Sequence, residues 1–342
     1  MAEEFLQLGR DDQHEVLEIA REKTGRPTHL LEKDVWVVWA LDRLFSSTLA
    51  ADLTFKGGTS LSKAYRVIDR FSEDVDLTYD IRKMLGDLTN GQGAFPANGS
   101  QARKWTKTVQ QRLPDWIANQ VQPILAAALA REKLDVTFEI SGPDNDKLLL
   151  RYPALKHGTG YIPPVVTLEF GARATGQPHH ALPVFCDMAQ HFEHVSFPSA
   201  RPVVMKAERT FWEKATAAHV YCSQGRIRGE RYARHWHDLA ALARSAYFAG
   251  AIADRDLAKD VAQHKSVFFP ESDGAGGRID YVAAVMGHLH IVPTGPARDA
   301  LAQDYALMLA DQVMIGAALP FDELMQACAT IEVAANKAAL KD

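Results

Sequence analysis

The chain has 342 residues, of which 47% are hydrophobic and 24% charged, and its formal net charge is −5. These values are typical of globular proteins and argue against a disordered chain or a strongly basic nucleic-acid-binding protein. No apolar run approaches bilayer length, and the N-terminus lacks a basic segment followed by an apolar stretch. We therefore expect a cytoplasmic protein with no membrane partner. The three cysteines are too widely separated to indicate a disulfide framework or a paired-cysteine zinc site.

Residues 1–50 predict two helices that pack on the core of the protein. The first runs from about Asp11 to Lys23, where acidic residues favour the start of a helix and Gly25 and Pro27 end it. The second runs from about Leu30 to Phe45. Its apolar residues keep helical spacing at Leu31, Val35, Val38, Leu41 and Phe45.

The stretch after these helices is typical of a phosphate-binding turn. Leu53 to Phe55 predicts a short strand, Gly57-Gly58 a turn that brings backbone close to a ligand, and Thr59 to Tyr65 the start of a helix. A helix N-terminus offers unpaired N–H donors, and Lys63 adds a full positive charge one turn inside. The predicted nucleotide-binding residues here are Gly57, Gly58, Thr59, Ser60 and Lys63.

Two aspartates follow in a segment predicted to be a strand, from Ser72 to Leu77. Successive strand side chains alternate between faces, so Asp74 and Asp76 share one face with Ser72. Neighbouring carboxylates repel unless a cation lies between them, and Mg²⁺ prefers a few carboxylates together with phosphate oxygens. A diglycine turn followed closely by Asp-X-Asp therefore indicates metal-assisted nucleotidyl transfer.

The two motifs, Phe55 to Lys63 and Arg70 to Leu77, resemble the AbiEii family of nucleotidyltransferase toxins in order and spacing. That family includes the MenT toxins and belongs to the DNA polymerase β-like superfamily; the earlier Glu32-Lys33-Asp34 also fits it. The resemblance implies an α+β fold, in which a polymerase β-like core has a small mixed sheet flanked by helices and is followed by a helical C-terminal region.

The resemblance also implies an activity. An enzyme of this kind transfers NMP from an NTP to an acceptor hydroxyl with two Mg²⁺ ions, or with Mn²⁺. It would act as the toxin of a type IV-like toxin–antitoxin or abortive-infection (phage-defence) pair with a cognate antitoxin. In the MenT branch the acceptor is tRNA, and the residue equivalent to Ser72 can be phosphorylated when the toxin is silenced.

Farther along the chain, a loop at Asn90 to Ser100 precedes a helical insertion at about 100–131, which Pro114 and Pro123 should break or kink. A hairpin is predicted at 134–140 and 147–152, and a strand at 165–171. Glu169 in that strand is the best candidate for the third acidic residue that polymerase β-like folds place beside the aspartates. His and Cys residues gather between 179 and 194, but their spacing fits no familiar zinc site.

A basic segment between Arg201 and His237 holds six Arg and two Lys against three Glu. It begins with a helix in which Lys214 resembles the family lysine that binds triphosphate, and Asp238 resembles the active-site aspartate of the last family motif. The loop between them could clamp substrate RNA or nucleotide, or contact only solvent. For the basic face of 101–131 the alternatives are RNA contact and simple solvation. The possible RNA contacts in the loop are Arg226, Arg228 and Arg231.

These expectations divide the chain into N-terminal helices at 1–50, a nucleotidyltransferase core at 51–200, and a helical C-terminal region at 201–342 that contributes Lys214 and Asp238 to the site. The alternatives are transfer to a protein or a small molecule, and a catalytically silent nucleotide sensor. Intact acidic residues disfavour the sensor, and the basic segments favour RNA over a small molecule.

Overall fold

The computed structural model describes residues 2–72, 74–89, 93–156, 163–225, 231–310, 314 and 316–340. Contacts between residues divide the chain into two compact units. The sheet unit comprises Met1–Ala64, Phe71–Ala94 and Lys104–Met205, and the helical unit comprises Tyr65–Arg70, Phe95–Arg103 and Lys206–Asp342. The chain therefore enters the helical unit briefly between the diglycine motif and the Asp-X-Asp motif.

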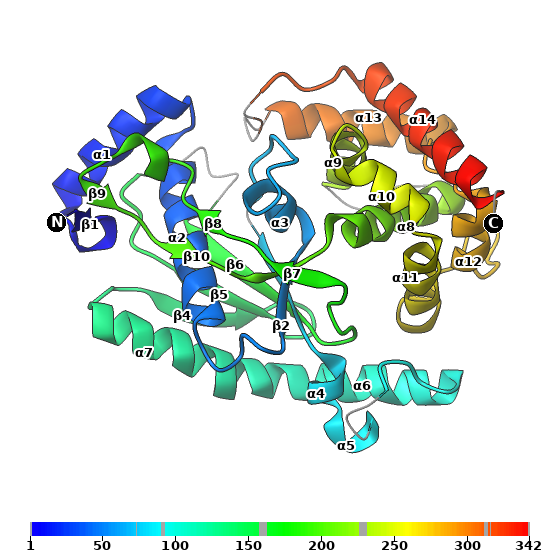
Figure 1. Ribbon diagram of the computed structural model, residues 1–342, viewed down its shortest axis with the longest axis horizontal. Coiled ribbons are helices and arrows are strands. Elements are labelled where there is room, and N and C mark those ends of the chain that lie inside the picture. Colours follow the sequence, from blue (N-terminus) through cyan, green and yellow to red (C-terminus); the bar gives the residue numbers. More distant parts are fainter. Residues whose placement is uncertain are drawn as a thin grey trace. The chain divides into compact units, whose positions relative to one another are not determined.

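The sheet unit is built on a mixed seven-stranded sheet with the order β4-β5-β6-β3-β2-β11-β7 (Figure 1). β3 runs parallel to β6 and antiparallel to β2, and β2 runs parallel to β11. The strands are β2 Leu53–Lys56, β3 Asp74–Tyr79, β4 Thr137–Ser141, β5 Lys147–Arg151, β6 Val165–Gly171, β7 His179–Ala181 and β11 Val203–Met205. Two short pairs complete the strands of this unit: β1 Glu3–Glu4 with β9 Val195–Ser196, and β8 Val184–Phe185 with β10 Ser199–Ala200.

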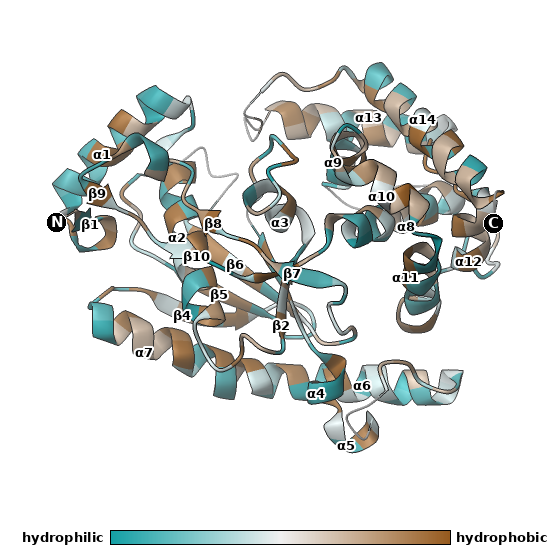
Figure 2. Cartoon of the chain, viewed as in Figure 1, coloured by the Kyte–Doolittle hydropathy of each residue, from teal (hydrophilic) through white to brown (hydrophobic). Residues whose placement is uncertain are grey.

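Strands β3, β5 and β6 have one buried face and one partly open face, because their side chains alternate. Val75 and Leu77 are fully buried, whereas Asp74 and Asp76 between them are half-buried. β5 and β6 follow the same alternation and carry hydrophobic residues along their length (Figure 2). Trp116 packs against Phe170 on the apolar face, with ring centroids 5.5 Å apart. These strands thus turn an apolar face to the core and a more polar face away from it.

Helices in this unit begin with α1 and α2, as the sequence predicts, and continue through α3 directly after β2. The expected long insertion is α6, a π-helical turn η2 and α7. α6 continues through Pro114, and Pro123 lies in α7 directly after the π-helical turn η2, so neither proline ends the helical segment. The bounds are η1 Phe5–Gln7, α1 Arg10–Thr24, α2 Thr28–Phe45, α3 Gly57–Lys63, α4 Ile81–Met84, α5 Gly86–Thr89, α6 Gly99–Trp116, η2 Ile117–Val121, α7 Gln122–Glu132 and η3 Ala189–His191.

The helical unit confirms the predicted helical C-terminal region. Its first helix, α8, buries Phe211, Ala215, Ala218 and Val220. The elements are α8 Ala207–Gln224, α9 Ala233–Ala243, α10 Tyr247–Ala253, α11 Arg255–Phe268, α12 Tyr281–Ala283, η4 Ala284–His288, α13 Gly295–Ala310 and α14 Phe321–Ala339. Within the described ranges, none of the helices is both long and apolar enough to cross a membrane.

Glu32 on α2 provides a stability prediction. Its carboxylate is buried and accepts hydrogen bonds from the backbone N–H of Leu155 at 3.0 and 3.2 Å. Burial raises the pKa of Glu32 to about 7, so folding favours its protonated form. The stability contributed by protonation is present at low pH and is lost as the pH rises from the unfolded pKa of 4.5 through about 7.

We therefore expect Glu32→Gln to stabilise the protein at pH 8, by on the order of 2 kcal/mol, and to change little at pH 4.5. The amide oxygen of glutamine can still accept from Leu155, so the change isolates the charge. Thermal unfolding midpoints of both proteins across this pH range provide the measurement. Equal pH dependence in wild type and variant would contradict the assignment.

Candidate active site

The structure brings Asp74, Asp76 and Glu169 to the same face of two neighbouring strands. β3 and β6 pair in parallel, with Asp74 opposite Thr167 and Asp76 opposite Glu169. Residues opposite each other in a ladder point to the same side, so the three carboxylates share the partly open face. This is the arrangement that the Asp-X-Asp spacing and the β-prone run around Glu169 predict.

Lys147 on β5 joins this group, although no sequence motif marks it. It lies opposite Glu169 in the β5–β6 ladder, and its ammonium contacts the Glu169 carboxylate at 2.7 Å. Burial lowers the pKa of Lys147, but the contact with Glu169 and the nearby Asp74 charge outweigh it and raise the pKa. Lys147 is therefore charged at neutral pH, and it offsets part of the repulsion among the carboxylates.

The donor set fits a hard cation held by two aspartates. Within the described residues, no three His, Cys, Asp or Glu side chains are gathered closely enough to hold a metal ion. Mg²⁺ commonly takes only one or two carboxylates, together with waters and substrate phosphate oxygens, so Asp74 and Asp76 suffice as its protein ligands. Glu169 as a third ligand stays a prediction, since its carboxylate is engaged by Lys147.

The absence of a side chain at Gly57 leaves space for the Asp76 carboxylate. This glycine has a φ of 75°, and a Cβ added to it would lie 2.0 Å from Asp76 Oδ2. The diglycine turn therefore serves two needs that only glycine meets: a left-handed backbone, and space for the carboxylate of the neighbouring strand. Lys56 and Asp76 are directly opposite in the β2–β3 ladder, which fixes this close approach.

Gly57→Ala should reduce activity at least about tenfold while leaving most of the fold intact. The added methyl would displace Asp76, and the left-handed backbone would cost about 1 kcal/mol. Steady-state kinetics should show the loss in kcat together with a weaker apparent affinity for Mg²⁺. Gly25→Ala is the matched control, because Gly25 has a φ of 70° and nothing within 4 Å of the added Cβ. Equal losses in both variants would show that backbone strain alone is responsible.

The polar side chains of α3 are largely used within the fold. Thr59 donates to the backbone oxygen of Asp74, and Ser60 donates to the backbone oxygen of Gly57 at 2.9 Å. The Thr59 hydroxyl thus attaches the predicted phosphate-binding helix to the first residue of β3. The groups that could still bind a phosphate here are the backbone N–H groups around Gly57 and Gly58. Phosphate binding by this stretch stays a prediction.

Lys63 lies in a buried ion cluster. Its ammonium contacts Asp34 of α2 at 2.5 Å and Asp187 at 2.6 Å, and Arg26 also pairs with Asp187. Burial lowers the pKa of Lys63, but the two carboxylates outweigh it and raise the pKa. The cluster fixes the end of α3 to α2, and it gives Asp34 of the Glu32-Lys33-Asp34 motif a structural role. The predicted Lys63–phosphate contact stays a prediction.

Ser72 lies before the strand that was expected to contain it. β3 begins at Asp74, and its ladder with β6 also begins there. Strand alternation therefore does not extend to Ser72, which is half-buried. The expected strand is wrong in including Ser72, and a role for Ser72 beside the aspartates stays a prediction.

Lys214 and Asp238 meet in the helical unit. Asp238 on α9 is fully buried, and its carboxylate accepts two hydrogen bonds of 2.8 Å from Arg70. Lys214 on α8 contacts the same carboxylate at 2.9 Å, and His237 lies 3.2 Å from its other oxygen. Burial alone would raise the pKa of Asp238, but Arg70 and Lys214 hold it well below its usual range.

Within the helical unit, the carboxylate of Asp238 forms ion pairs with Arg70 and Lys214. The Arg70 partner was not predicted, because Arg70 and Asp238 are 168 residues apart in the sequence. His235 is half-buried, and desolvation together with Lys214 lowers its pKa to about 3, so it is neutral. The predicted contact of Lys214 with the triphosphate stays a prediction.

Of the proposed RNA contacts, Arg226 and Arg228 lie outside the described residues. Arg231 is described: its backbone N–H donates to Asp304 at 2.7 Å, and its φ is 71°. Its backbone is therefore anchored to α13, and its contact with RNA stays a prediction.

Comparisons with known proteins give a family match and weaker structural similarities. Residues 39–327 match the family model described as nucleotidyl transferase AbiEii toxin, type IV TA system. MenT4, a nucleotidyltransferase toxin from Mycobacterium tuberculosis H37Rv, is 18% identical over 96% of this chain and 98% of its own, with a TM-score of 0.44. JHP933 from Helicobacter pylori is 15% identical over 92% of this chain and 95% of its own, with a TM-score of 0.42. The comparison with curated protein sequences gave no match.

Proposed function

This chain belongs to the AbiEii nucleotidyltransferase toxin family of type IV toxin–antitoxin systems, and we propose that it transfers NMP from an NTP to a hydroxyl of an RNA acceptor. The observation that carries the proposal is the pair Asp74 and Asp76 on a half-buried sheet face, with the Gly57 turn against Asp76. Two Mg²⁺ ions, or Mn²⁺, would be held there. When bound, they activate the attacking hydroxyl and offset charge on the leaving pyrophosphate.

In this proposal each residue of the site has a distinct role. Asp74 and Asp76 hold the metal, and Gly57 gives the nucleotide phosphates access to the backbone beside them. Lys147 keeps Glu169 oriented on the same face and limits the negative charge of the site. In this proposal the acceptor is tRNA, the cognate antitoxin silences the enzyme, and the pair acts in the cytoplasm in defence against phage.

The proposal is tested by incubating the purified protein with each labelled NTP, Mg²⁺ or Mn²⁺, and tRNA, protein or small-molecule acceptors. We expect label to enter tRNA only when metal and one preferred NTP are present. Label in a protein or in a small molecule would show that the acceptor is a protein or a small molecule, and not RNA. Nucleotide binding without transfer under every condition would favour a silent sensor.

A further inference from the structure

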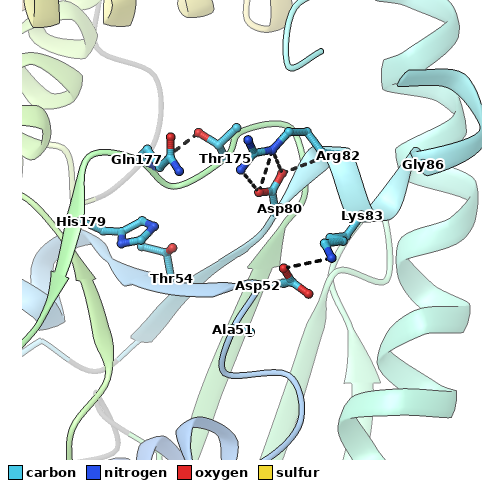
Figure 3. Close-up of a pocket in the computed structure, with 10 residues that line it drawn as sticks. All are labelled: Ala51, Asp52, Thr54, Asp80, Arg82, Lys83, Gly86, Thr175, Gln177 and His179. Atoms are coloured by element: carbon cyan, nitrogen blue, oxygen red, sulfur yellow. Dashed lines mark hydrogen bonds and ion pairs between the residues drawn. The ribbon is translucent and has the colours of Figure 1, made fainter. Parts of the chain in front are cut away.

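A cavity of about 480 Å³ lies in the sheet unit (Figure 3). Asp74 and Asp76 of the candidate active site do not line it. β2 and β3 are antiparallel, with Lys56 opposite Asp76 at one end of the pair and Leu53 opposite Tyr79 at the other. The cavity is at this second end, where Asp52 and Asp80 line it. Asp80 is four strand residues beyond Asp76, about 13 Å along the strand. The cavity is therefore separate from the candidate active site, yet within reach of the same extended ligand.

One wall of the cavity is a fixed guanidinium plane. Asp80 is buried, caps α4 by accepting from the Arg82 backbone N–H at 2.8 Å, and binds Arg82 Nε through both carboxylate oxygens at 3.0 Å. Figure 3 shows Arg82 lying across Asp80 in this pairing. Among the described residues, Nη1 of Arg82 donates no hydrogen bond to another side chain or backbone oxygen. The plane is thus preorganised and retains donors for a ligand.

Thr54, Gln177 and His179 form a second, polar part of the lining. Gly176 lies directly on Thr54, since a Cβ added to this glycine would be 2.3 Å from the Thr54 hydroxyl. The chain then continues through Gln177 to His179, whose ring lies beside Thr54 in Figure 3. In its neutral form the His179 ring offers one hydrogen-bond donor and one acceptor.

The charges of the cavity cancel. Asp80 pairs with Arg82, and Asp52 lies 3.6 Å from Lys83 at the rim. Balanced charge disfavours a polyphosphate or a free metal ion as the ligand. The described residues that line the cavity offer amide, carboxylate, hydroxyl, imidazole and guanidinium groups and include no large apolar side chain. Those groups hydrogen-bond base edges, and guanidinium and imidazole planes stack on bases.

We propose that this cavity binds one unpaired nucleotide of the acceptor RNA, an inference that rests on the proposed function. The volume suits one nucleotide and not a duplex. RNA is favoured over a free nucleotide by the adjoining surface. Arg112 of α6 binds Asp87 of α5 at 2.6 and 2.8 Å, next to the cavity residue Gly86, and α6 exposes Lys104 and Lys107. These lysines would contact the backbone that flanks the bound nucleotide.

Binding of a fluorescent single-stranded RNA to the full chain, without NTP, provides the test. Gln177→Trp fills the cavity, and His179→Ala removes its imidazole; both residues are exposed, so neither change should unfold the protein. Each should weaken RNA binding about tenfold, the loss expected for one stacked base. His180→Ala is the control, because its side chain points to the other face of the same strand. It should bind RNA as wild type does.

Free AMP, CMP, GMP and UMP form the second arm, measured by ligand-observed NMR. We expect weak binding of at least one of them, abolished by Gln177→Trp. Wild-type RNA affinity in both cavity variants would overturn the proposal, and monophosphate binding in the cavity without any effect on RNA would overturn the RNA assignment. No transfer occurs in these measurements. A protein that binds RNA through the cavity but fails to label it would therefore count against the proposed function and not against the cavity.

Discussion

Replacing Asp76 with asparagine is expected to lower nucleotidyl transfer by about a thousandfold or more, and Asp74→Asn should do the same. Asparagine keeps the size of the side chain but removes the negative charge that holds a divalent cation. The fold should survive, because both aspartates are half-buried on the open face of β3 and face other carboxylates. Removing one of several like charges relieves repulsion and should leave the unfolding midpoint equal or higher in the absence of metal.

The measurement is incorporation of labelled nucleotide under saturating NTP and acceptor, across a Mg²⁺ titration. Asp115→Asn on α6 is the matched control, since it is the same change at an exposed position. It should leave activity unchanged. Full activity of Asp76→Asn at low Mg²⁺ would mean that the metal, if needed, is held elsewhere. A loss in both the variant and the control would point to damage unrelated to the site.

Sequence predicted the centre of the sheet well, because local patterns determine it. β3 and β6 alternate between apolar and polar residues, and the hairpin β4–β5 surrounds a turn that contains glycine and asparagine. β7 and β11 were not predicted. β7 is three exposed residues beside prolines, with no apolar alternation, and it is a strand only because it pairs with Val203–Met205. Such an edge depends on long-range pairing that no local pattern reveals.

The same contrast between local motifs and long-range contacts applies to the candidate site. Asp74, Asp76 and Gly57 were predictable, because a short motif brings them to adjoining ends of β2 and β3. Lys63 illustrates the limit: a lysine after a diglycine turn favours a phosphate ligand, whereas the fold brings Asp34 and Asp187 to its ammonium. Contacts made by residues this distant in sequence require the folded chain. The Arg70–Asp238 pair was missed for the same reason.

Asp238→Asn should destabilise the helical unit by about 3–5 kcal/mol. The carboxylate is fully buried, and it balances the nearly buried charges of Arg70 and Lys214. Asparagine would leave two cations close together in a low-dielectric environment with one neutral partner, and breaking a buried pair by removing one member is far costlier than losing an exposed one. We expect a clear decrease in the thermal unfolding midpoint.

The pH dependence distinguishes this electrostatic cause from a packing defect. The pKa of Asp238 is depressed in the folded state, so its contribution is complete above the unfolded pKa of 3.8 and is lost as the pH falls below that value. The stability difference between wild type and Asp238→Asn should therefore be large at pH 7 and shrink in acid. Asp322→Asn is the control, because Asp322 pairs with Arg298 in the same unit while its side chain is 90% exposed. This control should shift the midpoint little at any pH. If Asp238→Asn proves as mild as the control at neutral pH, Asp238 does not neutralise the two cations, and the network must be held together by packing.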